Sequence, residues 1–306
     1  MAATNTTPRL ASRLVNGILA IAPLANFAKH KARQMMIDRA EGMGVPWRKI
    51  VAEWRSRDLD AELPLVENPG TKYPDYYLTS FHAYDKGNMS WEAATEVEVA
   101  AYAVHSKIWQ NAASDGDTML RSSYHDVVTH EIKSTPKDIL DIGCSVGMST
   151  FALQNIYPQA QITGLDLSPY FLAIANCNLR DRQNANNIKW VHAAAEATGL
   201  PDASFDLVSI FLVCHELPQT ATREILREAR RVLRPGGHIA IMDMNPRSQI
   251  YAKMPPYILT LLKSTEPYLD QYFALDIAQA IADAGFTQPS ITENTPRHRT
   301  IVAQAI

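Results

Sequence analysis

The sequence predicts an α/β protein in which helices cover a mostly parallel, doubly wound sheet. Three observations support this. From Asp138 onward, short apolar runs alternate with helical stretches, the pattern of a parallel sheet with covering helices. The run FDLVSIFLV is apolar throughout, as expected for a strand buried on both faces. Before Asp138 the chain has helical character and little strand character. We therefore expect a helical N-terminal cap over residues 1–133 and the α/β domain over residues 134–306.

Composition limits the function before any motif is considered. The chain has 306 residues, 46% of them apolar, and a net charge of −3, so it has no general excess of positive charge for binding nucleic acid. Its three cysteines are Cys144, Cys177 and Cys214, which are far apart in sequence. A sparse, odd set argues against a disulfide framework or a metal cluster and indicates a reducing compartment. We expect a cytoplasmic protein without a bound metal.

The N-terminal segment is basic and has no acidic residue before Asp38. Its apolar run VNGILAIAPLANFA has 14 residues and contains proline, so it is too short to span a bilayer. Three interpretations stay open: a plastid transit peptide, an amphipathic helix in peripheral contact with a membrane, or helices that pack on the rest of the protein. We favour packing.

The helical cap contains one well-marked helix, which begins after Ser90. Ser90 is a good N-cap, and Val97, Ala101, Val104 and Ile108 recur at helical spacing on one face. The loop before this helix is crowded with aromatic rings: Tyr73, Tyr76, Tyr77, Phe81, His82 and Tyr84. It is either a lid over a ligand, with Tyr77 and Tyr84 in contact, or a set of rings that fix the cap to the main domain.

The elements of the α/β domain follow in order. We expect strands at residues 138–142, 161–167, 188–192, 205–213 and 238–244. Helices should begin at Met148 and at Ser168-Pro169, where proline suits the first helical position. A further helix should run from Pro218 to Leu233, where the sequence RPGG ends it.

Ligands of such sheets bind beyond the carboxyl ends of the strands. The turn Gly143-x-Ser145-x-Gly147 follows the first strand there, and is a weak match to a dinucleotide fingerprint. Asp141 would repel a pyrophosphate at this turn but would attract an ammonium group. Asp166 ends the second strand, where it can accept both ribose hydroxyls. Two acids in these places fit S-adenosylmethionine (SAM) better than NAD.

The segments DIGCSVG, GLDLS, LPDASFDLV and RVLRPGGHIAIMD occur in an order that resembles class I (Rossmann-like) SAM-dependent methyltransferases over residues 133–306. Within that family the chain resembles the small-molecule branch, which includes quinone and sterol C-methylating enzymes. The segment FHAYDKGNMSWEA is similar to uncharacterised plastid and cyanobacterial-type methyltransferases. The resemblance implies a seven-stranded sheet with its last strand antiparallel, and FTQPSITEN and HRTIVAQA as the final two strands.

The resemblance also implies roles for the turn residues. Asp141 and Gly143 would hold the methionine amino group, and Gly147 would let the helix start close to the ligand. Asp166 would bind the ribose. Ser145 would hydrogen-bond the methionine carboxylate or simply fit the turn.

The adenine end and the reacting end complete the expected site. Leu167 would pack on the adenine, and Ala195 and Glu196 would lie beside it. The acid usual after the third strand is replaced by Ala194, so another group or water must take the adenine amino group.

Phe211 should end its strand beside the methyl group. His215 is the expected catalytic base, with a structural histidine as the alternative. In the insert after the fifth strand, Glu266, Tyr268 and Tyr272 would close the acceptor site or lie on a surface helix.

We therefore predict an enzyme that moves a methyl group by in-line displacement to a small, partly apolar metabolite. Oxygen and nitrogen acceptors are favoured and carbon stays open. The alternatives are a non-catalytic SAM-binding sensor or scaffold, and an NAD-dependent oxidoreductase. We expect no nucleic-acid partner, and the sequence identifies neither the acceptor nor the oligomeric state.

Overall fold

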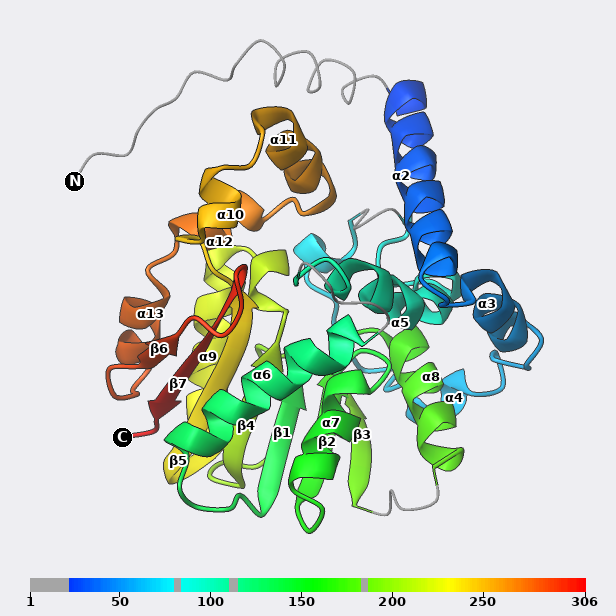
Figure 1. Cartoon of the computed structure of the whole chain (residues 1–306). Helices are drawn as coiled ribbons and strands as arrows, with labels where there is room; N and C mark the ends of the chain where they lie inside the picture. The colour runs from blue at the N-terminus through cyan, green and yellow to red at the C-terminus, as the bar shows by residue number, and fades with distance from the viewer. Residues whose placement is uncertain (1–21, 80–83, 110–114, 183–186) are drawn as a thin grey trace.

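A computed structural model of the chain describes residues 22–79, 84–109, 115–182 and 187–306 (Figure 1). Its strands form one seven-stranded sheet in the order β3-β2-β1-β4-β5-β7-β6. β1 to β5 pair in parallel, whereas β7 is antiparallel to both β5 and β6. The predicted fold class and the antiparallel last strand are confirmed. The strands are β1 (Asp138–Ile142), β2 (Gln161–Asp166), β3 (Ile188–His192), β4 (Phe205–Phe211), β5 (Leu233–Met244), β6 (Ser290–Thr292) and β7 (His298–Gln304).

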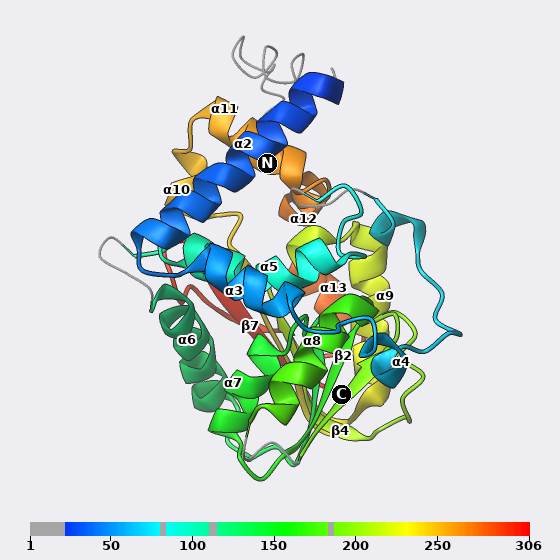
Figure 2. The ribbon, with the colours of Figure 1, turned by 90° about the vertical axis from the view of Figure 1, so that its right-hand side faces the viewer.

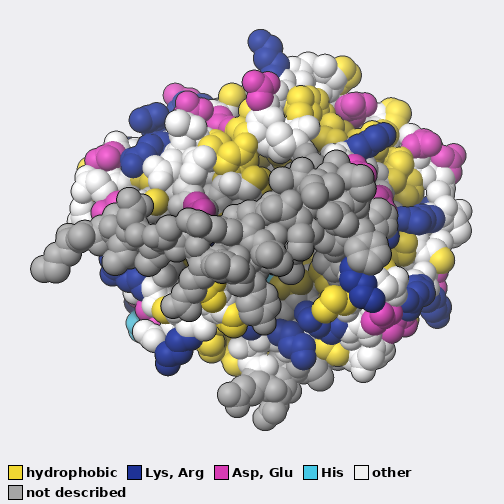
Figure 3. Space-filling view, turned by 90° about the horizontal axis from the view of Figure 1, so that it is seen from above, with side chains coloured by type: hydrophobic (Ala, Val, Ile, Leu, Met, Phe, Trp, Pro, Cys, Tyr) yellow, Lys and Arg dark blue, Asp and Glu magenta, His cyan; other side chains and the backbone are white. Residues whose placement is uncertain are grey.

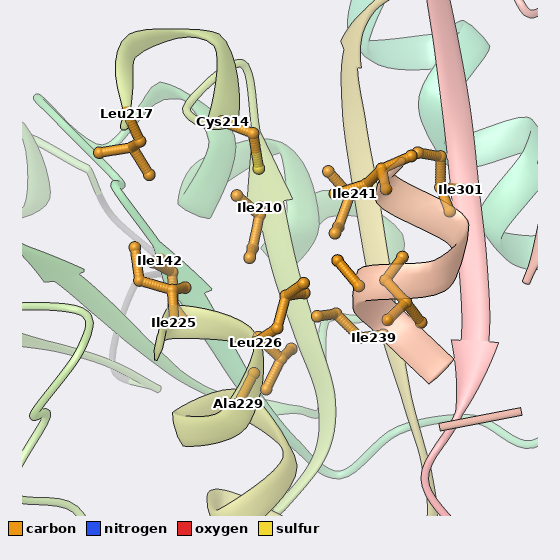
Figure 4. Close-up of a cluster of buried hydrophobic side chains, with 14 of the residues drawn as sticks. Ile142, Ile210, Cys214, Leu217, Ile225, Leu226, Ala229, Ile239, Ile241 and Ile301 are labelled. Atoms are coloured by element: carbon orange, nitrogen blue, oxygen red, sulfur yellow. The ribbon is translucent and has the colours of Figure 1, made fainter. Parts of the chain in front are cut away.

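Helices cover both faces of the sheet (Figure 1). One face carries α6 (Gly116–Glu131), α7 (Met148–Ile156) and α8 (Pro169–Arg180); the other carries α9 (Gln219–Val232) and α13 (Ile277–Asp283). Between α9 and the sheet lies a core of aliphatic side chains, including Ile142, Ile210, Ile225, Leu226 and Ile239 (Figure 4). This buried layer supplies the main driving force for folding and fixes the strand ends that build the site.

The bounds of β4 and β5 differ clearly from the sequence prediction. β4 ends at Phe211 rather than residue 213, because Leu212 adopts a left-handed backbone with φ 59°. This directs the chain into the short helix η2 (Cys214–Glu216). β5 begins at Leu233, directly after α9, so the sequence RPGG lies in the strand and not before it. Gly236, with φ 80°, allows the irregular start of that strand.

The N-terminal helices lie above the carboxyl ends of the strands (Figures 1 and 2). They are α2 (Ala22–Gly42), α3 (Trp47–Arg55), α4 (Leu63–Val66), η1 (Asp75–Tyr77) and α5 (Trp91–His105). α2 and α3 pack on α5. Ser90 caps α5 as predicted, since its side chain accepts a hydrogen bond from the backbone N–H of Ala93. The insert after β5 forms three helices on the side of the molecule away from α2 (Figure 1). They are α10 (Gln249–Ala252), α11 (Pro256–Thr265) and α12 (Leu269–Ala274).

A buried acid holds the N-terminal helices together. Glu96 on α5 is 1% exposed. Its carboxylate accepts hydrogen bonds from Arg33 on α2, with Nε 2.8 Å from Oε2, and from the hydroxyl of Tyr84, at 3.2 Å. The guanidinium of Arg55 on α3 lies 3.6 Å away. One carboxylate therefore ties α2, α3 and the aromatic loop to α5.

Within the described residues, no helix combines the length and apolar character needed to cross a membrane. Residues 1–21, which carry most of the basic N-terminal segment, and Phe81 and His82 of the aromatic loop lie outside the described part. Seen from above, the face over the strand ends carries hydrophobic side chains interspersed with charges of both signs (Figure 3).

Candidate active site

A large cavity of about 630 Å³ opens at the carboxyl ends of the strands, beneath the N-terminal helices. That volume is in the usual range for small-molecule sites. Segments far apart in the chain line it: the turns after β1, β2, β3 and β4, the aromatic loop, α5 and the insert after β5. Ten residues predicted for the site lie on its wall: Tyr77, Tyr84, Gly143, Ser145, Asp166, Leu167, Ala195, Glu196, Phe211 and His215.

The turn after β1 places two unusual backbone positions at the cavity. Gly143 has φ 70°, and a Cβ there would lie 2.5 Å from Val213 Cγ2, so only glycine fits. Ser145 has φ 50°, the left-handed region where glycine is common. Its backbone N–H donates to Asp166 Oδ2 at 2.8 Å, while its buried hydroxyl has no hydrogen-bond partner among the described residues. A ligand in the cavity can supply that partner.

Asp141 and Gly147 are not on the cavity wall. Asp141 is fully buried, and its Oδ2 accepts hydrogen bonds from Ser149 Oγ (2.7 Å) and Thr150 Oγ1 (2.6 Å) at the start of α7. Its other oxygen, Oδ1, is buried with no hydrogen-bond partner among the described residues. The carboxylate thus supports the turn through Oδ2, and the expected contact of Asp141 with the methionine amino group stays a prediction. Gly147, with φ 89°, starts α7 as the sequence predicts.

Asp166 is held rigidly at the end of β2. Its two carboxylate oxygens accept backbone hydrogen bonds from Ser145 and Ser168, each at 2.8 Å. Burial raises the pKa of Asp166 to about 6, and the backbone donors only partly oppose that effect. Each oxygen keeps a further lone pair, so this carboxylate can accept a pair of neighbouring hydroxyls.

A carboxylate lies close to the position of the acid that is missing at Ala194. Glu196, two residues later, lines the cavity. Its Oε1 accepts a hydrogen bond from the hydroxyl of Tyr76, and its Oε2 is buried with no hydrogen-bond partner among the described residues. Glu196 therefore presents a carboxylate oxygen that can accept a hydrogen bond from an amino group.

The aromatic loop has two different functions in the structure. Tyr73 and Tyr76 fix it to the sheet: Tyr73 Oη lies 3.1 Å from His192 Nε2, and Tyr76 binds Glu196. Tyr77 and Tyr84 line the cavity, and so does Tyr76. Burial, followed by the charges of Asp166 and Glu216, raises the pKa of Tyr77. The loop therefore both attaches to its neighbours and forms part of the cavity wall.

The far half of the cavity is apolar. The helix face with Val97, Ala101 and Val104 lines the cavity, and Val104 is 44% exposed. Lining residues on α5 extend from Ala93 to His105, roughly 18 Å at 1.5 Å per residue. Apolar side chains of α2, α3 and the insert also line the cavity, namely Met36, Trp47, Met254, Ile258 and Leu262.

His215 stands where the two halves meet. Its Nδ1 lies 2.7 Å from Oδ1 of Asp243, a fully buried acid at the end of β5. Burial alone would lower the pKa of His215, but the charge and hydrogen bond of Asp243 outweigh it and raise the pKa to about 10. The raised pKa favours the protonated ring at neutral pH, which donates a hydrogen bond. The predicted role of His215 as catalytic base requires the neutral ring and stays a prediction.

The three residues predicted in the insert after β5 differ in their position relative to the cavity. Glu266 lines the cavity, whereas Tyr268 packs edge-on against Tyr76, with ring centroids 6.2 Å apart. Tyr272 is buried, and its hydroxyl donates to the carbonyl of Met244.

Sequence reasoning missed several polar residues on the cavity wall, among them His105, Arg121, Arg297 and His298. Three lie at the ends of helices or strands, and Arg121 lies in the second turn of α6. Only a three-dimensional arrangement of the cap could have identified them.

Comparisons with known proteins agree with this geometry. Residues 140–241 match a family described as the methyltransferase domain. A demethylmenaquinone methyltransferase of Geobacillus sp. (strain WCH70) is 30% identical over 177 residues, 52% of this chain and 74% of the relative. A ubiquinone/menaquinone biosynthesis C-methyltransferase of Shewanella frigidimarina is 27% identical, over 51% of this chain and 69% of the relative.

A solved structure shares the fold. Phosphoethanolamine N-methyltransferase 2 of Haemonchus contortus, in complex with S-adenosyl-L-methionine, superposes with a TM-score of 0.52 at 14% identity, over 72% of this chain and 61% of that one. The sheet order, the glycine turn after β1 and these relatives show that the chain belongs to the class I SAM-dependent methyltransferases.

Proposed function

We propose that this methyltransferase moves the methyl group of SAM by in-line displacement to a small, largely apolar metabolite. The observation that carries the proposal is one continuous cavity. Its polar end is built from the turns after β1, β2 and β3, and its other end is an apolar channel along α5. Bound SAM supplies a methyl group on a sulfonium. The chain's main contribution is alignment of the two reactants and exclusion of water.

The residues at the polar end fit SAM. Ser145 Oγ and Glu196 Oε2 are buried, have no hydrogen-bond partner within the described residues, and belong to cavity-lining side chains. We assign Ser145 and Gly143 to the methionine end and Asp166 to the ribose. Leu167, Ala195 and Glu196 take the adenine, with Glu196 accepting from its amino group in place of the acid missing at Ala194. Tyr77, Tyr84 and Phe211 cover the cofactor.

The division of the chain supports the same proposal. We assign residues 134–306 to the cofactor-binding domain and the chain before them to a cap, in which α2, α3 and α5 supply one wall of the acceptor channel, although α6 of that segment covers the sheet. The apolar lining of α5 and α11 favours an acceptor with a hydrocarbon ring or chain. Our sequence expectation is an oxygen or nitrogen acceptor, while the Shewanella relative is named for methylating carbon. The position of the methyl group in the product, found by mass spectrometry, distinguishes these.

Calorimetry with S-adenosylhomocysteine (SAH) and with NAD tests the cofactor. We expect SAH to bind and NAD not to bind; the reverse result would identify an oxidoreductase. Incubation with methyl-labelled SAM and a panel of quinols, phenols and amines then tests catalysis. SAH binding without labelling of any panel member would favour the sensor alternative.

A substitution in the channel separates acceptor from cofactor. Ala101→Phe should fill the channel, leave SAH affinity within about twofold and abolish labelling of acceptors. Ala52→Phe, on the exposed side of α3, is the matched control and should change neither. Loss of SAH binding in Ala101→Phe would place the cofactor, not the acceptor, against α5.

A further inference from the structure

Three histidines from distant parts of the chain line the apolar cavity. They are His105 at the end of α5, His215 after β4 and His298 at the start of β7. In each ring Nδ1 is already engaged: with Asp117 at 2.7 Å, with Asp243 at 2.7 Å and with Thr295 at 2.9 Å, respectively. Nε2 of each ring makes no hydrogen bond to any of the described residues. All three therefore keep one ring nitrogen for a ligand.

The position of His105 depends on an unusually close approach of two helices. α6 begins at Gly116, where a Cβ would lie only 2.6 Å from the carbonyl oxygen of His105. This contact brings Asp117 against the imidazole. Asp117 also accepts a hydrogen bond from Arg121 Nε at 2.8 Å. Although burial opposes it, the Arg121 charge and the His105 hydrogen bond hold the pKa of Asp117 at about 2. His105 is thus anchored to a permanent carboxylate.

His298 and His215 are brought together by the sheet. β7 pairs with β5 so that His298 lies opposite Met244, next to Asp243, the partner of His215. The two rings differ in charge. Burial, together with the nearby His105 and His215, lowers the pKa of His298 to about 3, so it is neutral. His215 is a cation beside Asp243. The described residues contain no group of three His, Cys, Asp or Glu arranged to hold a metal ion.

We propose that His105, His215 and His298 form a polar site that binds the hydroxyl oxygen of a phenolic or enolic acceptor. The inference rests on the proposed function and names the chemical class of its acceptor. A protonated His215 donates to the oxygen and stabilises it as an oxyanion. The neutral His298 accepts the Thr295 hydroxyl hydrogen at Nδ1, so its Nε2–H is a second donor to that oxygen. The channel along α5 takes the apolar remainder of the molecule. An amine would gain nothing from a cationic donor.

A pair of small aromatic probes tests this without the natural acceptor. 4-Nitrophenol and nitrobenzene differ only in the hydroxyl, and nitrophenolate has its own visible absorbance. Both are titrated into the SAH-loaded protein. We expect 4-nitrophenol to bind at least about tenfold more tightly than nitrobenzene, because polar groups in an apolar cavity discriminate against a ligand that cannot pair with them. Bound probe should show phenolate absorbance at a pH where free probe is mostly protonated.

Variants identify the residues responsible. His105→Asn can still donate a hydrogen bond to Asp117 but lacks the second ring nitrogen. His105→Asn and His298→Ala should each reduce the preference for 4-nitrophenol over nitrobenzene about fivefold or more. The affinity for nitrobenzene should stay within about twofold of the wild-type value. His130→Ala, an exposed histidine on α6, is the matched control. Equal affinities for the two probes in the wild type, or an unchanged preference in both variants, would overturn the proposal. Failure of SAH to bind would instead reject the proposed function.

Discussion

The ionisation of Asp166 should control the affinity for SAH across a measurable pH range. The group is buried, and its pKa in the ligand-free protein is raised to about 6. A carboxylate accepts two ribose hydroxyls, whereas a carboxylic acid gives up one acceptor position to its own proton. Binding therefore requires the ionised form. That form is nearly fully populated at pH 8, half populated at pH 6 and about one-eleventh populated at pH 5.

The apparent dissociation constant rises as the competent fraction falls. We expect SAH to bind about twofold more weakly at pH 6 than at pH 8, and about tenfold more weakly at pH 5. Calorimetry between pH 5 and 8 measures this. Asp166→Asn should bind weakly at every pH with a flattened profile. Asp141 is the other carboxyl with a pKa near 6, and it is not on the cavity wall. Any pH dependence of SAH affinity that remains in Asp166→Asn would be due to Asp141. A flat wild-type profile, or the same profile in Asp166→Asn, would refute the reasoning.

Three further predictions concern the frame around the site. Asp243→Asn should lower the free energy of unfolding by about 2–4 kcal/mol at pH 7, seen by urea denaturation, because the partner of a buried cation is lost. The raised pKa of His215 means that this contribution is complete below about pH 6.5 and lost as pH rises toward 10, so the difference between variant and wild type should shrink at pH 10. Glu96→Gln should lower stability by about 1–3 kcal/mol and increase proteolysis of the cap, whereas the exposed Glu53→Gln should do neither. Gly143→Ala should lower stability by about 1–3 kcal/mol and weaken SAH binding at least tenfold, since the added Cβ meets Val213; unchanged binding would remove this turn from the site.

The order of strands and the cofactor half of the site could be predicted because they follow local patterns. β1 and β3 have the predicted bounds, and β2 differs by one residue, since buried parallel strands between turn residues leave a clear periodic signal. Ser145 and Asp166 follow directly from strand ends. Asp141 has the expected residue type at the expected position, but one oxygen of its carboxylate accepts hydrogen bonds from the hydroxyls of α7, a contact that the sequence pattern did not predict. The sequence determines where a side chain is attached, but its rotamer depends on the residues that pack around it in the folded protein.

The acceptor half could not be predicted in the same way, because it is assembled from non-local contacts. The apolar face of α5 has the pattern of a helix that covers a core, and nothing in that pattern distinguishes a core from a cavity wall. His105 and His298 are 193 positions apart and meet only through the packing of α6 against β7. The charge state of His215 depends on Asp243, a residue of another strand. Such properties follow from tertiary geometry, which periodicity does not encode.

Ser145 shows how the cofactor half combines strain with ligand recognition. A non-glycine residue at φ 50° is destabilised by roughly 1 kcal/mol relative to glycine, and burying its hydroxyl without a partner adds to that cost. Glycine would relieve both effects in the ligand-free protein. A ligand that hydrogen-bonds the hydroxyl recovers the second cost on binding, so the serine makes affinity depend on the ligand's polar groups. Ser145→Gly should therefore stabilise the free protein and yet bind SAH more weakly, and a variant that gained stability with no loss of affinity would show that the serine serves the turn alone.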